Sequence, residues 1–194
     1  TTATVGASQS YTFTSASGVE SVSSYLSSTN GDVAFNDLQA NAKVILDGSK
    51  GDVTADFANP VVVGSADVAN VEIKNDASTD VLNIGDGDDE FETINIAVGT
   101  GKNTITDIED GASSNLGETS KIVISGSGQL TLGETVLKDA SEIDGSSATG
   151  KLLITPDATV DKLTGGSAAD TFTLTVADFG SSNAAKTIDG GAGT

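Results

Sequence analysis

The chain has 194 residues and a formal net charge of −19, from 28 acidic residues and 9 basic residues that are all lysine. It has no Cys and no His, which excludes disulfide bonds, thiolate nucleophiles, zinc–thiolate sites and a His-based catalytic triad. The negative charge would repel nucleic acid and anionic membrane, so we expect neither nucleic-acid binding nor membrane insertion. A hard divalent cation with oxygen ligands is the partner that this composition favours.

Short apolar runs bounded by Gly, Asn, Asp or Ser recur along the chain and predict β-strands. Apolar residues make up 37% of the chain and aromatic residues 4%, so the core must consist of thin layers of Val, Ile, Leu and Ala. We therefore predict an all-β fold, a parallel β-helix or β-roll solenoid. The segment 18–26 is the one place where a helical turn or two fits the sequence. The predicted strands are Tyr11–Phe13, Val44–Leu46, Val61–Val63, Val71–Ile73, Val81–Ile84, Ile94–Ile96, Ile122–Ile124, Leu152–Ile154 and Phe172–Leu174.

A nine-residue repeat, G-G-x-G-x-D-x-U-x with U a large apolar residue, is the most informative pattern in the middle of the chain. Residues 75–83 and 84–92 match it in direct tandem, and residues 98–106 match it again after an insertion. The sixth positions of these units are Asp80, Asp89 and Asn103, and the eighth positions are Leu82, Phe91 and Ile105. We expect the apolar eighth positions to stack in the core.

Between this tandem and the next, residues 125–128 (Ser-Gly-Ser-Gly) predict a hairpin. The break in the repeat leaves two organisations open. Residues 1–115 and 116–194 are two β-solenoid segments, each with its own calcium-loop tandem, or the whole chain is one continuous solenoid.

A second tandem follows at residues 156–164 and 165–173, with Asp161 and Asp170 in the sixth positions. In residues 181–189 the sixth position is Lys186, which cannot ligate a metal. Residues 190–194 then match the first five positions of another unit, so we expect this chain to be a fragment of a longer one.

The repeat has the chemistry of a calcium-binding turn. Glycines at the first, second and fourth positions allow positive φ, so carbonyl oxygens can turn inward around an ion, and the sixth-position Asp adds a charged oxygen. One unit supplies fewer than the about six to eight oxygens that calcium prefers, so ions would be shared between stacked turns. For Asp86 to Asp89 and for the 165–170 loop, a solvated acidic turn is the alternative interpretation. The candidate ligands are Asp80, Gly85, Asp86, Gly87, Asp89, Gly99, Gly101, Asn103, Asp161, Gly165, Ser167 and Asp170.

These nonapeptides resemble the calcium-binding repeats of RTX proteins. The stretch from Ser141 to Ile154, leading into Leu163–Phe172, is similar to the strand-and-loop units of RTX-type bacterial surface-layer proteins. The resemblance implies a secreted, extracellular protein that folds around several Ca²⁺ ions and self-associates into a lattice on the cell surface. It also implies anchoring to a cell-surface polysaccharide through regions outside this fragment.

Three classes of function follow. The leading prediction is a non-enzymatic structural protein of a calcium-dependent surface layer. A stalk or binding module of an RTX adhesin is the alternative, because it would use the same calcium chemistry. A polysaccharide-cleaving β-helix enzyme is the third, and the absence of Arg and the scattered two Tyr and six Phe disfavour it.

Overall fold

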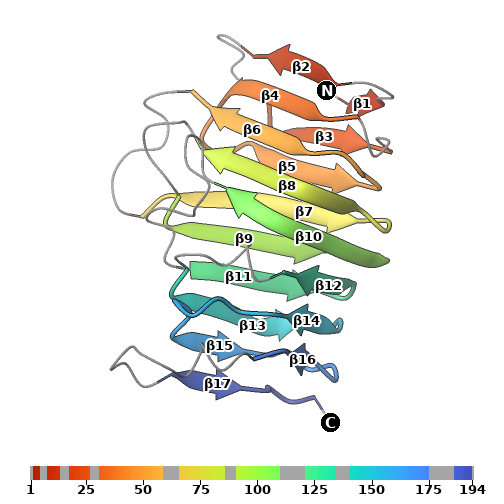
Figure 1. The fold of residues 1–194 in the computed structure, drawn as a ribbon. Helices are drawn as coiled ribbons and strands as arrows, with labels where there is room; N and C mark the ends of the chain where they lie inside the picture. Colours follow the sequence, from red (N-terminus) through yellow and green to blue (C-terminus); the bar gives the residue numbers. More distant parts are fainter. Residues whose placement is uncertain are drawn as a thin grey trace.

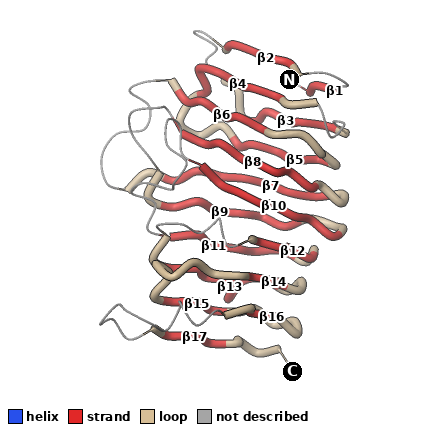
Figure 2. Tube along the Cα trace, viewed as in Figure 1, coloured by secondary structure: helices blue, strands red, loops and turns tan. Residues whose placement is uncertain are grey.

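The computed structural model describes residues 2–4, 8–13, 18–26, 31–58, 66–85, 91–109, 121–133, 140–174 and 186–193. In these residues the chain winds into a β-solenoid of stacked coils, and two parallel sheets face each other across the core (Figure 1). The predicted all-β solenoid is confirmed. Figure 2 shows strands and loops but no helix in the described residues, and thus no helix long and apolar enough to cross a membrane.

Each coil contributes one strand to each sheet. The odd-numbered strands form a nine-stranded sheet and the even-numbered strands form an eight-stranded sheet, both in sequence order and with parallel pairing between neighbours. The strands are β1 (Thr2–Thr4), β2 (Gln9–Thr12), β3 (Ser21–Tyr25), β4 (Val33–Leu38), β5 (Lys43–Asp47), β6 (Val53–Phe57), β7 (Val68–Lys74), β8 (Ser78–Gly85), β9 (Thr93–Val98), β10 (Lys102–Glu109), β11 (Lys121–Gly126), β12 (Gln129–Leu132), β13 (Glu142–Ala148), β14 (Leu152–Ile154), β15 (Lys162–Thr164), β16 (Thr171–Phe172) and β17 (Thr187–Asp189).

The core is built from columns of aliphatic side chains that stack from coil to coil. Alternate residues of each strand point inward, as the period of two in a β-strand requires. In the nine-stranded sheet one column is set by the paired positions Val22, Val44, Val71, Ile96 and Ile124, each at most 2% exposed. Full burial of one such side chain stabilises the fold by about 1.5–3 kcal/mol, so these columns hold the two sheets together.

Two local predictions are wrong. Residues 18–26 contain strand β3 rather than helical turns, because Val22 and Ser24 alternate inward with the rest of the sheet. Residues 125–128 form no hairpin, because β11 and β12 belong to different sheets and each pairs in parallel with strands of adjacent coils. β9 pairs with β11 in one sheet and β10 pairs with β12 in the other, so the strands before and after residues 110–120 belong to the same two sheets.

The solenoid has two edges with different connections. At the tight edge, on the right in Figure 1, short corners such as 75–77, 99–101 and 127–128 lead from an odd strand to the next even strand. At the loop edge, on the left, connections such as 155–161 lead from an even strand to the next odd strand. The nine-residue units alternate between the edges, since 98–106 and 165–173 begin at the tight edge and 156–164 at the loop edge.

Candidate functional site

The tight edge is a column of glycines in backbone contact. A Cβ atom at Gly128 would lie 1.6 Å from the carbonyl oxygen of Gly99, and one at Gly150 would lie 1.9 Å from that of Gly128. Successive corners therefore approach too closely for any side chain at these positions. Gly101 also has the positive φ that the repeat predicts, at 99°. The glycines serve close packing between coils as well as turn conformation.

Acidic side chains at the same edge accept hydrogen bonds from backbone N–H groups of neighbouring coils. Asp52 Oδ1 accepts a hydrogen bond from the backbone N–H of Val81 at 2.9 Å, and Asp76 Oδ1 accepts one from that of Lys102 at 2.7 Å. Asp32 Oδ1 accepts one from the N–H of Asp52 at 3.2 Å. The sequence analysis did not predict these three roles. The repeated Gly-Asp-Val at 31–33 and 51–53 is the signal that would have found two of them.

The 165–170 corner is the described loop that best matches a calcium-binding turn. Gly165 and Gly166 are buried, and the Asp170 carboxylate folds back over them. Its Oδ2 accepts a hydrogen bond from the N–H of Gly166 at 2.7 Å, and its Oδ1 accepts one from Leu152 N–H at 2.8 Å. Each carboxylate oxygen has a second lone pair, so Asp170 can hold the loop closed and still coordinate an ion.

Carbonyl oxygens of this corner face the next one, at residues 190–193. A Cβ atom at Gly191 would lie 2.3 Å from the carbonyl oxygen of Gly166 and 2.5 Å from that of Gly165. One at Gly193 would lie 1.7 Å from the carbonyl oxygen of Ala168. The last two corners are therefore in close backbone contact, and the carbonyl oxygen of Gly166 accepts a hydrogen bond from Ala192 N–H at 2.9 Å. Backbone and carboxylate oxygens, which this seam brings close together, are the ligand types that calcium takes.

The 99–103 corner has the amide side chain of Asn103 in the sixth repeat position instead of a carboxylate. Asn103 is fully buried, and its Nδ2 lies 3.4 Å from the carbonyl oxygens of Thr100 and Gly101 and 3.3 Å from that of Gln129 in the next coil. Its Oδ1 accepts a hydrogen bond from Ala77 N–H of the preceding coil at 3.2 Å. This amide therefore forms hydrogen bonds with residues of three consecutive coils. Its N–H groups occupy the carbonyl oxygens that would otherwise be available to coordinate a metal ion.

The remaining candidate ligands are dispersed. Asp80 is an exposed residue of β8, beyond the 75–77 corner, and Gly85 is buried at the end of the same strand. Ser167 is exposed in the 165–170 corner, and Asp161 lies at the loop edge. Asp86, Gly87 and Asp89 lie outside the described residues. The structure thus brings Gly99, Gly101 and Asn103 together at one corner, and Gly165 and Asp170 at another.

The apolar eighth positions of the repeat are in the core as predicted. Leu82, Ile105 and Leu163 are at most 1% exposed, and Phe91 is 2% exposed with its ring edge-on to Phe57 at 4.9 Å between centroids. Phe172 is partly buried against the same core. Neither of the two phenylalanines of the repeat is displayed as a platform for a sugar.

Ion pairs cover part of the outer face of the nine-stranded sheet. Glu142 Oε1 lies 2.7 Å from Lys162 Nζ and 3.4 Å from Lys121 Nζ, and Asp144 Oδ2 lies 3.2 Å from Lys121 Nζ. The hydrogen bond from Lys162 is the main cause that lowers the pKa of Glu142, and the hydroxyl of Ser146 is the main cause that lowers the pKa of Asp144. These carboxylates have lysine partners and are poor candidates for metal ligands.

A similar cluster crosses β5 and β7. Glu72 lies 2.9 Å from Lys74 Nζ and 3.2 Å from Lys43 Nζ, and Lys74 also lies 3.8 Å from Asp47. The hydrogen bond between Glu72 and Lys74 is the main cause that lowers the pKa of Glu72 and raises that of Lys74. Together the two clusters place lysines on this face against neighbouring carboxylates.

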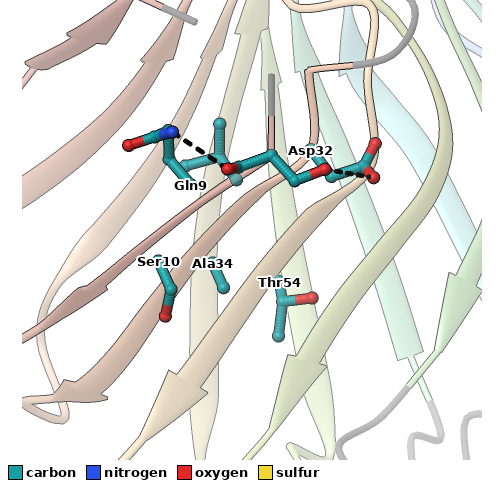
Figure 3. Close-up of a pocket in the computed structure, with 7 residues that line it drawn as sticks. Gln9, Ser10, Asp32, Ala34 and Thr54 are labelled. Carbon is teal, nitrogen blue, oxygen red and sulfur yellow. Dashed lines mark hydrogen bonds between the residues drawn. The ribbon is translucent and has the colours of Figure 1, made fainter.

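Two shallow grooves lie on the outer faces of the sheets. One, of about 320 Å³, crosses the nine-stranded sheet over Lys43, Asn70, Asn95 and Ser125. The other, of about 260 Å³, lies near the first coils of the eight-stranded sheet (Figure 3). Beside it, Ser8 donates its hydroxyl hydrogen bond to Asp32 at 3.0 Å.

The donor chemistry limits what metal site can form. Within the described ranges no three acidic side chains gather as a metal-binding group. A calcium ion in this part of the chain would therefore take its oxygens mainly from backbone carbonyls and water, and the 165–170 corner with its neighbour at 190–193 fits that requirement. No protein-family model matches the chain, and comparisons with curated proteins and with solved structures give no match either.

Proposed function

We propose that this chain is a structural segment of a secreted bacterial surface layer, and that calcium drives its folding and its assembly into a lattice. The observation that supports this best is the seam between the 165–170 and 190–193 corners. There the Asp170 carboxylate closes the first corner, and the carbonyl oxygens of Gly165, Gly166 and Ala168 lie against the second corner in the next coil. An ion in this seam would bind two coils at once, so metal binding would stabilise the stacked form over the unfolded chain.

The net charge supports the same proposal. The chain carries −19 at pH 7, and its own lysines neutralise a minority of the 28 carboxylates. Self-repulsion expands such a chain when no cations are bound. Extracellular calcium sites commonly bind at about 10⁻⁴ to 10⁻³ M, so the protein would fold after export rather than in calcium-poor cytosol.

A calcium titration followed by circular dichroism tests the coupling of metal to fold. We expect the β signal and the melting temperature to rise together with calcium and to fall on addition of chelator. The variant D170N should need more calcium for the same melting temperature, because it removes the charged oxygen of the seam. The matched control is E20Q, which removes the same charge at an exposed position before β3. A wild-type melting temperature that excess chelator leaves unchanged would refute the coupling.

Assembly needs a separate measurement. Electron microscopy of the chain in calcium should show ordered two-dimensional arrays, with magnesium as the control ion, because magnesium demands a stricter octahedral geometry. Folded protein that stays monomeric in calcium would contradict the lattice part of the proposal while leaving calcium-dependent folding intact.

A stalk or binding module of an adhesin is the second candidate. The observation that favours it is the groove over the nine-stranded sheet, where Asn70 and Asn95 are joined by a hydrogen bond of 3.1 Å and Lys43 lies at one end. Amide groups in a shallow groove can bind the hydroxyls of a polysaccharide. Glycan binding by soluble monomers that N95A abolishes would favour this candidate over the lattice.

A further inference from the structure

The side chain of Lys186 crosses from one coil to the next at the loop edge. Its ammonium donates hydrogen bonds to the carbonyl oxygen of Ala158 at 2.5 Å and to that of Val160 at 2.8 Å. It also lies 3.6 Å from Asp161 Oδ1, and its side chain is 12% exposed. The donors of an ammonium this well covered need acceptors within the protein, so these contacts define a specific position for it.

The three acceptors have a fixed relation to the nine-residue repeat. Ala158, Val160 and Asp161 occupy the third, fifth and sixth positions of the unit 156–164. They are two backbone carbonyls and one carboxylate that converge on a single positive charge. This is an oxygen cradle of the kind that hard cations take, and a nitrogen that belongs to the chain fills it.

We propose that residues 158–161 form a cation site whose cation is the ammonium of Lys186, so that the seam between β15 and β17 closes without a metal ion. The inference goes beyond the proposed function, because it rests on the contacts of Lys186 alone and stands whether or not calcium binds at other corners.

The residue in the equivalent position of an earlier coil is Glu92, and its charge also matches the backbone group that it faces. Just before β9, Glu92 Oε2 accepts a hydrogen bond from the backbone N–H of Asp67 at 2.7 Å. There the neighbouring coil presents an N–H and meets an anion, whereas before β17 it presents carbonyl oxygens and meets a cation. The sign of the side-chain charge thus follows the backbone group that it faces.

Lys162 shows how an ordinary surface lysine differs. It lies in the adjacent strand β15, its side chain is 53% exposed, and its ammonium contacts the carboxylate of Glu142. No hydrogen bond from its ammonium to a backbone carbonyl is found among the described residues. Lys162 has the same charge and side-chain length as Lys186 but lacks the oxygen cradle, so it is a matched control.

Removal of the ammonium should leave a site for an external ion. In K186A the three oxygens remain and space opens beside them, so calcium with its water ligands can enter. In K186M the long apolar stem remains, which keeps the space filled and leaves the carbonyls without a partner. The two variants therefore separate the cradle from the packing of the side chain.

The experiment counts bound calcium and measures local opening. Equilibrium dialysis in about 1 to 10 mM calcium should show one more ion per chain in K186A than in the wild type, and no gain in K162A or K186M. Hydrogen exchange in the same buffer should show the Thr187 amide, which donates to Asp161 O at 2.8 Å, exchanging about tenfold faster in K186M than in the wild type. K162A should match the wild type.

Two results would overturn the inference. Wild-type protection of Thr187 in K186M would mean that the ammonium does not hold the seam. Loss of protection in K186M without any gain of an ion in K186A would make Lys186 a plain hydrogen-bond donor rather than the occupant of a cation site. If the wild type binds no calcium and K186A binds one ion, the inference holds and the calcium-dependent function fails.

Discussion

The tight edge and the loop edge join the coils of this solenoid by different means. At the tight edge, backbone meets backbone at Gly128 and Gly150, where no Cβ atom has room, and short Asp side chains such as Asp76 accept hydrogen bonds from the next coil. At the loop edge, long charged side chains reach across, as Glu92 and Lys186 do. The first edge therefore restricts residue size, and the second selects the sign of the charge.

This difference predicts how each edge fails. A substitution at the tight edge forces neighbouring coils apart, so its effect spreads through both sheets and the core columns between them. A substitution at the loop edge removes one or two hydrogen bonds at a single seam. The largest losses of stability should therefore come from the smallest residues in the chain.

G128A is expected to have the largest effect. Its new Cβ atom would lie 1.6 Å from the carbonyl oxygen of Gly99, a contact with backbone that cannot rotate away. We expect the free energy of unfolding to fall by about 3 kcal/mol, at the upper end for overpacking. Urea denaturation followed by circular dichroism measures this.

The matched control for G128A is G190A, a glycine that also follows an odd strand. A Cβ atom at Gly190 would meet nothing within 4 Å, so its cost should stay below about 0.5 kcal/mol. Equal losses in the two variants would show that the effect comes from backbone entropy and not from the close approach of the coils.

N103D tests whether a corner closed by an amide can be converted to one closed by an ion. The substitution replaces an N–H donor with a carboxylate oxygen facing the carbonyls of Thr100, Gly101 and Gln129. Without calcium we expect a loss of about 2 kcal/mol from the unsatisfied and repelling oxygens. Calcium should restore more stability to N103D than to the wild type, as thermal melts at matched ionic strength would show.

N95D is the control for this conversion. Asn95 lies on the outer face of β9, partly exposed, with its amide donating to Asn70 at 3.1 Å. Its substitution makes the same change of charge outside any corner, so the cost should be under about 1 kcal/mol and calcium should have no added effect. A calcium response in N95D equal to that in N103D would contradict a site at the corner.

The sequence predicted the solenoid because two signals agreed. Runs such as Val71–Ile73 and Ile94–Ile96 gave the strands, and the nine-residue unit placed Leu82, Phe91 and Leu163 in the core. It mistook β3 for helical turns because Ser and Val are weak signals for either state. The sequence predicted a hairpin at 125–128 because a short Gly-Ser turn fits both a hairpin and a corner between two sheets. Only the pairing of β11 and β12 with strands of other coils distinguishes the two structures.

The candidate site was less accessible to sequence reasoning, for a physical reason. Spacing identifies a turn, but it does not show which donor fills the turn. The repeat made Asn103 a candidate ligand and Lys186 a residue unable to ligate. In the structure the N–H groups of both side chains meet carbonyl oxygens of a neighbouring coil. Contacts across coils depend on loop lengths, and paired residues such as Glu142 and Lys162 are 20 positions apart rather than at a multiple of nine.

The smallest effect should come from neither edge but from the ion pairs on the outer face. The pKa of Glu142 is lowered from 4.5, chiefly by Lys162, and the pKa of Asp144 is lowered as well. A lowered pKa in the folded state means that the pair stabilises the protein above about pH 4.5 and that this contribution is lost as the pH falls through the lower folded value. Stability should therefore decrease as the pH falls below about 4.5.

E142Q removes part of that dependence. Because Lys162 is 53% exposed, solvent screens the pair and the loss at pH 7 should be less than about 1 kcal/mol. The slope of unfolding free energy against pH should be shallower in E142Q than in the wild type, measured by urea denaturation at each pH. A cost for E142Q as large as that for G128A would mean that the sheet faces, and not the tight corners, set the stability of the stack.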